Sequence, residues 1–169
     1  MVIAVLGATG QLGSELLGLW GEDAVGLSRD RLDLLDPGTV DAVLDEVEPE
    51  VVVNAAAYNQ VDRAESEPAA AMAVNALGPR QLARSCASRG IRLVHISSDF
   101  VFGADPGRRD PYTESDETGP LGAYGVSKLG GELYVRSGCP DHLVVRTCGL
   151  YGHAARKRQG GGNFVETML

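Results

Sequence analysis

Tyr124 and Lys128 stand four residues apart in the segment "LGAYGVSKLGGE". On a helix this spacing brings two side chains onto the same face. A free tyrosine has a pKa of about 10, and a nearby ammonium group favours the phenolate, which lowers that pKa and eases proton release. The pair therefore suggests a tyrosine acid tuned by a lysine. The alternative is an exposed pair on a surface helix, so the elements around it have to decide.

Two hydroxyls, Ser97 and Ser98, close the apolar segment "IRLVHISS", which predicts a strand. Open α/β sheets bind their ligands at the carboxyl ends of the strands. A hydroxyl at that edge can hydrogen-bond a substrate oxygen and stabilise developing charge. It can also do no more than cap the following turn.

A glycine-rich turn opens the chain in "VIAVLGATGQLGSELLGLW", which reads as strand, turn and helix. Gly7, Gly10 and Gly13 give the spacing G-x-x-G-x-x-G. Such glycines permit a tight turn, close approach of a pyrophosphate and close helix packing, while free amides at the helix N-terminus face the phosphates. The position in the first strand-helix unit favours a dinucleotide site over a merely structural turn.

The residues that follow the next two predicted strands indicate which cofactor binds. The second ends at Ser28 and Arg29, and an arginine at this point suits a ribose 2′-phosphate. This predicts NADPH, with NADH also possible because Asp30 and Asp33 are close in sequence. After the third strand, Ala55–Ala57 leave room for a cofactor over the strand end, although they could equally serve tight packing.

Five short apolar segments, bounded by turn residues, each predict a strand buried on both faces: "VIAVLG", "DAVGLS", "EVVVNAAA", "IRLVHISS" and "HLVVRT". Helical patterns alternate with them at Leu12–Trp20, Val40–Val47, Ala69–Ser88 and Tyr124–Arg136. This alternation predicts an α/β fold, a Rossmann-type doubly wound parallel sheet with helices on both faces.

The chain is expected to divide into a NAD(P)-binding Rossmann domain over residues 1–152 and, over 153–169, the start of a truncated substrate-binding region. "GGGNFVETML" suggests a loop that leads into a new helix, so we expect the front part of a longer protein. Residues 103–120 form a long polar loop. Loops of this length within a compact domain are usually functional or disordered.

Composition narrows the class of protein. The hydrophobic content is 44% and the net charge is −8, which argues against nucleic acid as a partner. No apolar run reaches the roughly 20 residues of a membrane span, and the N-terminus does not resemble a signal peptide. The three cysteines are widely spaced and predict reduced thiols in a cytoplasmic protein, with neither a disulfide framework nor a zinc site.

The chain resembles the extended short-chain dehydrogenase/reductase family, in particular its branch that reduces nucleotide-linked deoxysugars. The segments that carry the resemblance are, in order, "GATGQLGSEL", "LDLLDP", "VVVNAAAYNQVDRAESEP", "VNALGPRQLA", "HISSDFVFG", "PYTESD", "YGVSKLGGE" and "GGNFVETML". The resemblance covers nearly the whole chain. It implies catalytic roles for Ser98, Tyr124 and Lys128, and substrate contacts for Ser98, Asp99 and Tyr124. It also implies cofactor contacts from Gly7, Thr9, Gly10, Gln11, Leu12, Ser28, Arg29, Asp33, Leu34, Ala55, Ala56, Ala57, Asn75, Tyr124 and Lys128.

The implied reaction is the NADPH-dependent reduction of the C4 ketone of a nucleotide-linked 4-keto-6-deoxysugar. Tyr124 would donate the proton, Ser98 would orient the oxygen, and Lys128 would hold the nicotinamide ribose and tune Tyr124. Two other readings stay open: a non-catalytic regulatory subunit of the same fold, and a sugar-nucleotide epimerase or dehydratase.

Two positions bear on the substrate and on assembly. Gly149 stands where the family usually has a tryptophan that packs on the sugar, which leaves the sugar open. Glu15 matches a glutamate that some members use in a magnesium-bridged dimer, so a homodimer is possible, although no metal site is expected within this chain.

Overall fold

A computed structural model of the chain describes residues 1–152; the predicted start of a substrate-binding region, 153–169, lies outside the described residues. Its centre is a five-stranded sheet in the order β2-β1-β3-β4-β5, in which every neighbouring pair is parallel. The strands are β1 (Ile3–Leu6), β2 (Ala24–Leu27), β3 (Val51–Asn54), β4 (Arg92–Ser98) and β5 (His142–Thr147). All five predicted strands are present.

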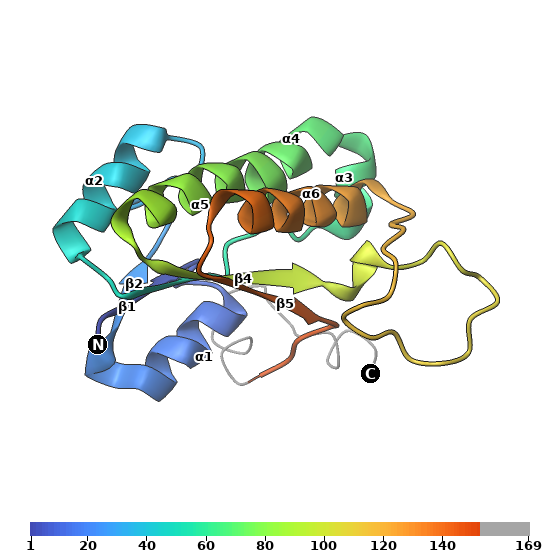
Figure 1. Cartoon of the computed structure of the whole chain (residues 1–169), viewed down its shortest axis with the longest axis horizontal. Coiled ribbons are helices and arrows are strands. Elements are labelled where there is room, and N and C mark those ends of the chain that lie inside the picture. The colour runs from blue at the N-terminus through green and yellow to red at the C-terminus, as the bar shows by residue number, and fades with distance from the viewer. Residues whose placement is uncertain (153–169) are drawn as a thin grey trace.

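Helices cover both faces of the sheet, as Figure 1 shows. Helix α1 (Gln11–Trp20) lies on one face, and α2 (Pro37–Val47), α3 (Val61–Ser66), α4 (Pro68–Met72), α5 (Gly78–Arg89) and α6 (Ala123–Gly138) lie on the other. The chain winds from β1 to β2 in one direction and then crosses back to β3. Because such crossovers are right-handed, the reversal moves the helices to the opposite face. The predicted Rossmann-type doubly wound fold is confirmed.

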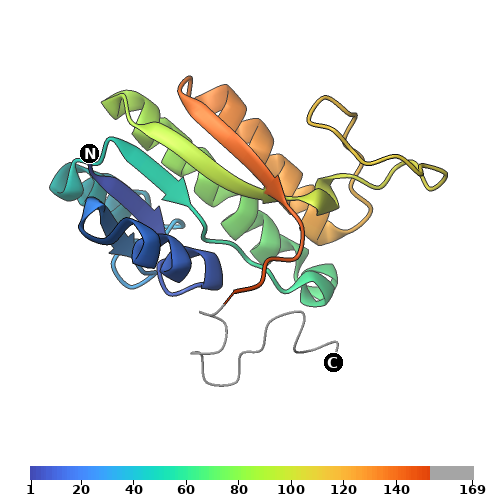
Figure 2. The same cartoon turned by 90° about the horizontal axis from the view of Figure 1, so that it is seen from below.

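The core has two unequal parts. The larger lies between the sheet and helices α2, α5 and α6, and includes Leu6, Leu44 and Leu93. The smaller lies under α1 and centres on Ile3 and Val5. The prediction that every strand is buried on both faces is wrong for the two edge strands: no residue of β5 and only one residue of β2 is fully buried. Among the described residues, α1 packs on β1 and β2 and leaves β4 and β5 open on that side (Figure 2).

The predicted helix over 69–88 forms as one run with a wider turn in its middle. α4 passes into a π-helical turn, η2 (Ala73–Leu77), before α5 begins. Pro79 supplies the reason, because a proline has no N–H to donate to the carbonyl four residues earlier, and its ring crowds that carbonyl. The carbonyl in question belongs to Asn75. The helix thus widens at Asn75, a residue that connects two segments of the candidate site.

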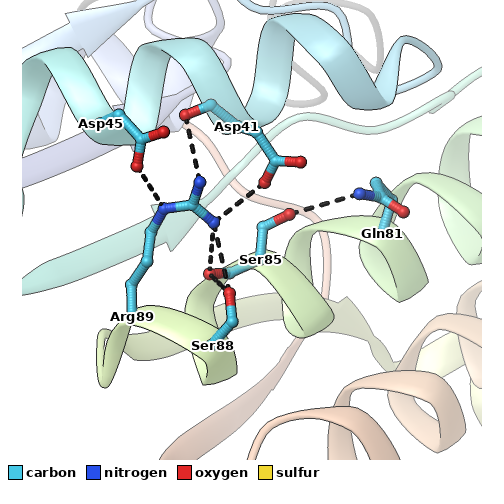
Figure 3. Close-up of polar contacts among 6 residues, drawn as sticks. All are labelled: Asp41, Asp45, Gln81, Ser85, Ser88 and Arg89. Carbon is cyan, nitrogen blue, oxygen red and sulfur yellow. Dashed lines mark hydrogen bonds and ion pairs between the residues drawn. The ribbon is translucent and has the colours of Figure 1, made fainter.

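Helices α2 and α5 are joined by one arginine (Figure 3). Arg89 donates from Nε to Asp45 at 2.7 Å and from Nη1 to Asp41 at 2.9 Å, and it also donates to the carbonyl oxygen of Ser85. The contact lies near the end of α5, where a cation also offsets the partial negative charge of the last carbonyls.

The predicted long loop is confirmed, since residues 103–120 contain no helix or strand. It projects away from the sheet beyond the 3₁₀ turn η3 (Asp99–Val101) (Figure 1). The amide of Gly119 donates to the carbonyl oxygen of Val101 at 2.9 Å, which closes the neck of the loop. Within the described residues, none of the helices is long and apolar enough to cross a bilayer.

Candidate functional site

The glycine turn between β1 and α1 is built by close backbone approach. Gly7 has a positive φ of 76°, and a Cβ there would lie 2.8 Å from the amide nitrogen of Ala56. A Cβ on Gly13 would collide with the carbonyl oxygen of Gly7. No side chain of the described residues caps the N-terminus of α1, so its first amides are available to an anion. This is the geometry expected of a pyrophosphate-binding turn.

A cavity of about 460 Å³ lies where the carboxyl ends of β1, β2 and β3 meet. Strands β1 and β3 are neighbours although the chain reaches β3 only after β2, so this is the point where the strand order reverses and open α/β sheets bind ligands. The predicted residues that line it are Gly7, Thr9, Gly10, Arg29, Asp33, Leu34, Ala55, Ala56 and Ala57.

Sequence reasoning did not name the rest of the wall, namely Leu6, Leu27, Leu32, Leu35, Tyr58, Asn59, Gln60 and Val74. Most of these residues continue segments that were recognised: Tyr58 to Gln60 follow the three alanines, and Leu32 and Leu35 flank the pair Asp33 and Leu34. Their position next to recognised cofactor residues in the sequence was therefore the signal that could have identified them.

Some predicted cofactor residues lie outside the lining of this cavity. Gln11 and Leu12 form the first turn of α1 next to Gly10. The hydroxyl of Ser28 bonds to Asp30 and lowers the pKa of that carboxyl. Of the second-strand residues, Arg29 does reach the cavity; its side chain is 79% exposed and lies 3.6 Å from Asp33. The arginine is thus held beside the cavity mouth by a weak, solvated ion pair.

Asn75 is buried and acts between two segments of the site. Its Oδ1 accepts from the amide of Tyr58 at 2.8 Å, and its Nδ2 donates to the carbonyl oxygen of Tyr58 at 2.9 Å. The same nitrogen lies 3.0 Å from Oγ of Ser127 on α6. Asn75 therefore ties the cavity wall after β3 to the helix that carries Tyr124 and Lys128, and does not itself line the cavity.

Ser98 and Tyr124 come together at the end of β4. Burial raises the pKa of Tyr124, a hydrogen bond with Ser98 lowers it, and the charge of Asp99 raises it; the net shift is upward. Oγ of Ser98 also donates to Asp99 at 3.1 Å and accepts from the amide of Phe100 at 3.2 Å. The side chains of Ser98 and Tyr124 are thus close enough to affect one another at the edge of the sheet.

Lys128 lies one turn further along α6 and is 2% exposed. Its Nζ donates to the carbonyl oxygen of Ile96 at 2.7 Å. Burial lowers its pKa to about 8, against a smaller raising effect of Glu132. Burial has the largest effect on the pKa of Tyr124, and the ammonium of Lys128 is bonded to a strand carbonyl, so the expected effect of Lys128 on Tyr124 stays a prediction.

The remaining predicted positions lie at the surface. Asp99 and Gly149 are exposed, and Glu15 lies on the exposed side of α1. No group of three or more metal-ligating side chains occurs among residues 1–152. Cys86 and Cys139 are buried free thiols, and Cys148 is an exposed one.

A doubly wound parallel sheet with a glycine turn at its switch point places the chain in the Rossmann-type α/β fold class, with Ser98 on β4 and Tyr124 and Lys128 on α6. The whole chain, residues 1–169, matches the family described as RmlD substrate binding domain. The chain belongs to this family.

Curated relatives agree with this assignment. A dTDP-4-dehydrorhamnose reductase of Streptomyces griseus is 46% identical over 98% of this chain and 53% of its own length. A dTDP-4-keto-6-deoxy-D-glucose reductase of Streptomyces niveus is 42% identical over 98% of this chain and 56% of its own length. The chain therefore spans about half the length of the curated relatives it matches.

Solved structures show the same fold. A dTDP-4-dehydrorhamnose reductase of Clostridium acetobutylicum superposes with a TM-score of 0.90 at 38% identity, over 99% of this chain and 58% of that one. The enzyme of the same name from Bacillus anthracis, solved in complex with NADP, gives a TM-score of 0.88 at 35% identity, over 99% of this chain and 59% of that one.

Proposed function

We propose that this chain forms the cofactor-binding and catalytic half of a reductase that transfers hydride from NADPH to the C4 ketone of a nucleotide-linked 4-keto-6-deoxysugar. The observation that carries the proposal is the placement of Ser98 at the end of β4 and of Tyr124 and the buried Lys128 one turn apart on α6, with Lys128 bonded to β4 and the cavity at the same edge of the sheet. Membership of the family, and relatives named as ketoreductases of dTDP-linked deoxysugars, support it.

The residues around the cavity fit a dinucleotide. The glycine turn and the free amides of α1 suit the pyrophosphate. Leu34 and Asp33 would border the adenine end, and Arg29 would face a ribose 2′-phosphate. NADP bound to the Bacillus anthracis relative supports NADPH as the cofactor, with NADH as the weaker substitute. When bound, this cofactor supplies the hydride.

The protein's own part is to place and protonate the ketone oxygen. Tyr124 would donate its phenolic proton to that oxygen, and Ser98 would hydrogen-bond the same oxygen and stabilise its charge. Tyr124 is protonated at neutral pH, as an acid requires, because a tyrosine ordinarily titrates near 10 and burial raises its pKa further. Lys128 has N–H donors besides the one bonded to the Ile96 carbonyl, and with these it would hold the nicotinamide ribose and act on Tyr124.

The sugar is the least defined part. One relative is named for dehydrorhamnose and another for 4-keto-6-deoxyglucose, both dTDP-linked, and we assign the class of substrate that they share. Gly149 leaves more space near the site than a tryptophan would, which is compatible with either sugar. A cytoplasmic location, supported by three free thiols, and a homodimer are parts of the same proposal.

The test compares three proteins that carry this chain within the full-length gene product: wild type, Tyr124→Phe and Tyr134→Phe. Tyr134 lies on the same helix and contacts Arg80 instead of Ser98, so it is the matched control. We expect the wild type and the control to oxidise NADPH with a dTDP-4-keto-6-deoxysugar. Tyr124→Phe should lose about 100-fold or more in turnover.

Cofactor binding is measured separately, as the shift in unfolding midpoint with NADPH; a ligand at about 100 times its Kd stabilises by roughly 2.7 kcal/mol. Tyr124→Phe should keep this shift. Undiminished turnover in Tyr124→Phe would remove the assigned role of Tyr124. A wild type that binds NADPH but reduces no keto-sugar would favour the regulatory alternative, and cofactor that copurifies and does not exchange would favour the epimerase or dehydratase.

A further inference from the structure

Glu132 is a fully buried carboxylate in the middle of α6. Its Oε1 accepts from Oγ of Ser97 at 2.6 Å, and Arg146 donates to both of its oxygens, at 2.8 and 2.7 Å. Arg136 reaches the same carboxylate from the surface at 3.2 Å. Burial alone raises the pKa of Glu132, but the bonds from Arg146 and Ser97 more than offset this effect, so its pKa is low and it is an anion.

Glu132 and its partner Ser97 lie on the two elements that carry the proposed catalytic residues. Ser97 is the residue before Ser98 on β4, and Glu132 lies one helical turn after Lys128 and two turns after Tyr124. A Cβ on the neighbouring Gly131 would collide with the carbonyl oxygen of Asn75, so the close approach of α6 to η2 requires a glycine at this position. The carboxylate thus fixes the distance and register between the strand that carries Ser98 and the helix that carries the other two.

Arg146 extends the contact into the loop 103–120. Its guanidinium lies 4.8 Å from the ring centre of Phe102, which is stacked on Tyr112 at 4.2 Å with the ring planes 9° apart. Arg108 covers the other face of Tyr112 at 4.2 Å and pairs with Asp116 at 2.7 Å. Two arginines therefore contact two stacked rings, and both the cation–π contacts and the ring stacking are attractive.

We infer that Glu132 is a positioning residue for the Ser98, Tyr124 and Lys128 site, and that Arg146 transmits its restraint to the loop 103–120, which adjoins that site through η3. The inference rests on the proposed function, in which these three residues are catalytic. A buried ion pair is weak as a source of stability, since apolar residues of similar size often replace it without loss. Apolar residues cannot replace the hydrogen bond from Ser97 to Glu132 or the two hydrogen bonds from Arg146 to the same carboxylate.

The test therefore uses a double variant, Glu132→Leu with Arg146→Met, in the full-length protein. It removes both charges together, so neither is left buried and unpaired, and it keeps an apolar filling of similar size. Ser97→Ala removes only the bond to β4. Arg136→Ala is the matched control, because it deletes a 45% exposed partner of the same carboxylate.

We expect the double variant to unfold near the wild-type midpoint and to bind NADPH with a Kd within about twofold of wild type, while kcat with the keto-sugar falls about 10- to 100-fold because the reacting groups are misplaced. Ser97→Ala should lower kcat less, and Arg136→Ala should change nothing beyond about twofold. In hydrogen exchange, amides of residues 103–120 should exchange faster in the double variant only.

The outcomes separate the two proposals. A double variant that keeps wild-type kcat and wild-type exchange in the loop overturns the positioning role. A wild type without turnover, in which the double variant still frees the loop, overturns the proposed function and leaves the restraint on the loop standing. If kcat falls only in step with the unfolded fraction, Glu132 serves stability alone and the inference is wrong.

Discussion

The ammonium group of Lys128 is buried and hydrogen-bonds the carbonyl oxygen of Ile96 at 2.7 Å, which ties α6 to β4 one turn from Tyr124. A buried ammonium with few partners is costly in its charged form. Its pKa is accordingly lowered to about 8 by burial. In the unfolded chain the same lysine titrates near 10.5.

This difference predicts how stability depends on pH. Between about pH 8 and 10.5 the unfolded chain binds the Lys128 proton and the folded chain does not, so this group makes the free energy of unfolding rise with pH in that window. The difference amounts to about 3 kcal/mol. Lys128→Met should therefore gain stability relative to wild type at pH 7 and lose that advantage by pH 10.5.

The measurement is urea unfolding of both proteins across this pH range, reported as wild type minus variant. The difference cancels the opposite effects of Tyr124 and of Cys86, whose pKa burial raises to about 12. Parallel pH profiles for the two proteins would contradict the buried, readily deprotonated lysine.

Arg29 gives a prediction for cofactor choice. Arg29→Ala should weaken NADPH about tenfold, because a charge-assisted contact to the 2′-phosphate is lost, and should leave NADH unchanged. Arg31→Ala is the control, since Arg31 pairs with Glu46 at 2.9 Å and does not line the cavity. Titration calorimetry with both cofactors decides; equal weakening of NADPH and NADH would rule out a 2′-phosphate contact.

The sequence predicted the fold well where the signal is local. The strand His142–Thr147 and the helix over 12–20 are recovered within one residue, because apolar runs and glycine turns mark their ends. Helix α3 was missed, since its six residues are mostly polar and carry no helical period. The burial of β5 was overestimated because periodicity reports an apolar strand and not which helix covers it.

The candidate site likewise has a part that local sequence predicts and a part that it does not. The cavity wall at Gly7, Gly10 and Ala55–Ala57 follows from strand ends and glycine spacing, both of which can be read along the chain. The contacts that hold Tyr124 in place join residues 35 or more positions apart, such as Ser97 with Glu132 and Asn75 with Ser127. Nothing in the local pattern of a glutamate or an asparagine distinguishes such a buried role from an exposed one.

The close backbone approach in the glycine turn is tested by two glycine-to-alanine substitutions in α1. Gly13→Ala places a methyl group against the carbonyl oxygen of Gly7, where backbone must shift, so we expect a loss of about 1–3 kcal/mol and of the NADPH-induced rise in midpoint. Gly18→Ala meets no atom within 4 Å and should stabilise by about 0.5–1 kcal/mol. Retained NADPH binding in Gly13→Ala would show that the turn tolerates a wider approach and would weaken the pyrophosphate assignment.

The contact between α2 and α5 provides the opposite case: a change there should alter the free energy of unfolding but not NADPH binding. Arg89→Ala removes the bonds to Asp41 and Asp45 and to the carbonyl oxygen of Ser85. We expect a loss of about 1 kcal/mol, typical of a small charge network, and a smaller loss at about 1 M salt, where screening acts within roughly 3 Å. Arg84→Ala, at an exposed position of the same helix, is the control.

Neither variant should alter the NADPH-induced shift in midpoint, because Arg89 pairs with α2 and does not line the cavity. Urea unfolding at low and high salt, with and without NADPH, gives all of these quantities in one series. If Arg89→Ala lowers the free energy of NADPH binding as much as the free energy of unfolding, the packing of α2 on α5 also positions Leu34 in the cavity wall. The site would then depend on the whole helical layer and not on the sheet edge alone.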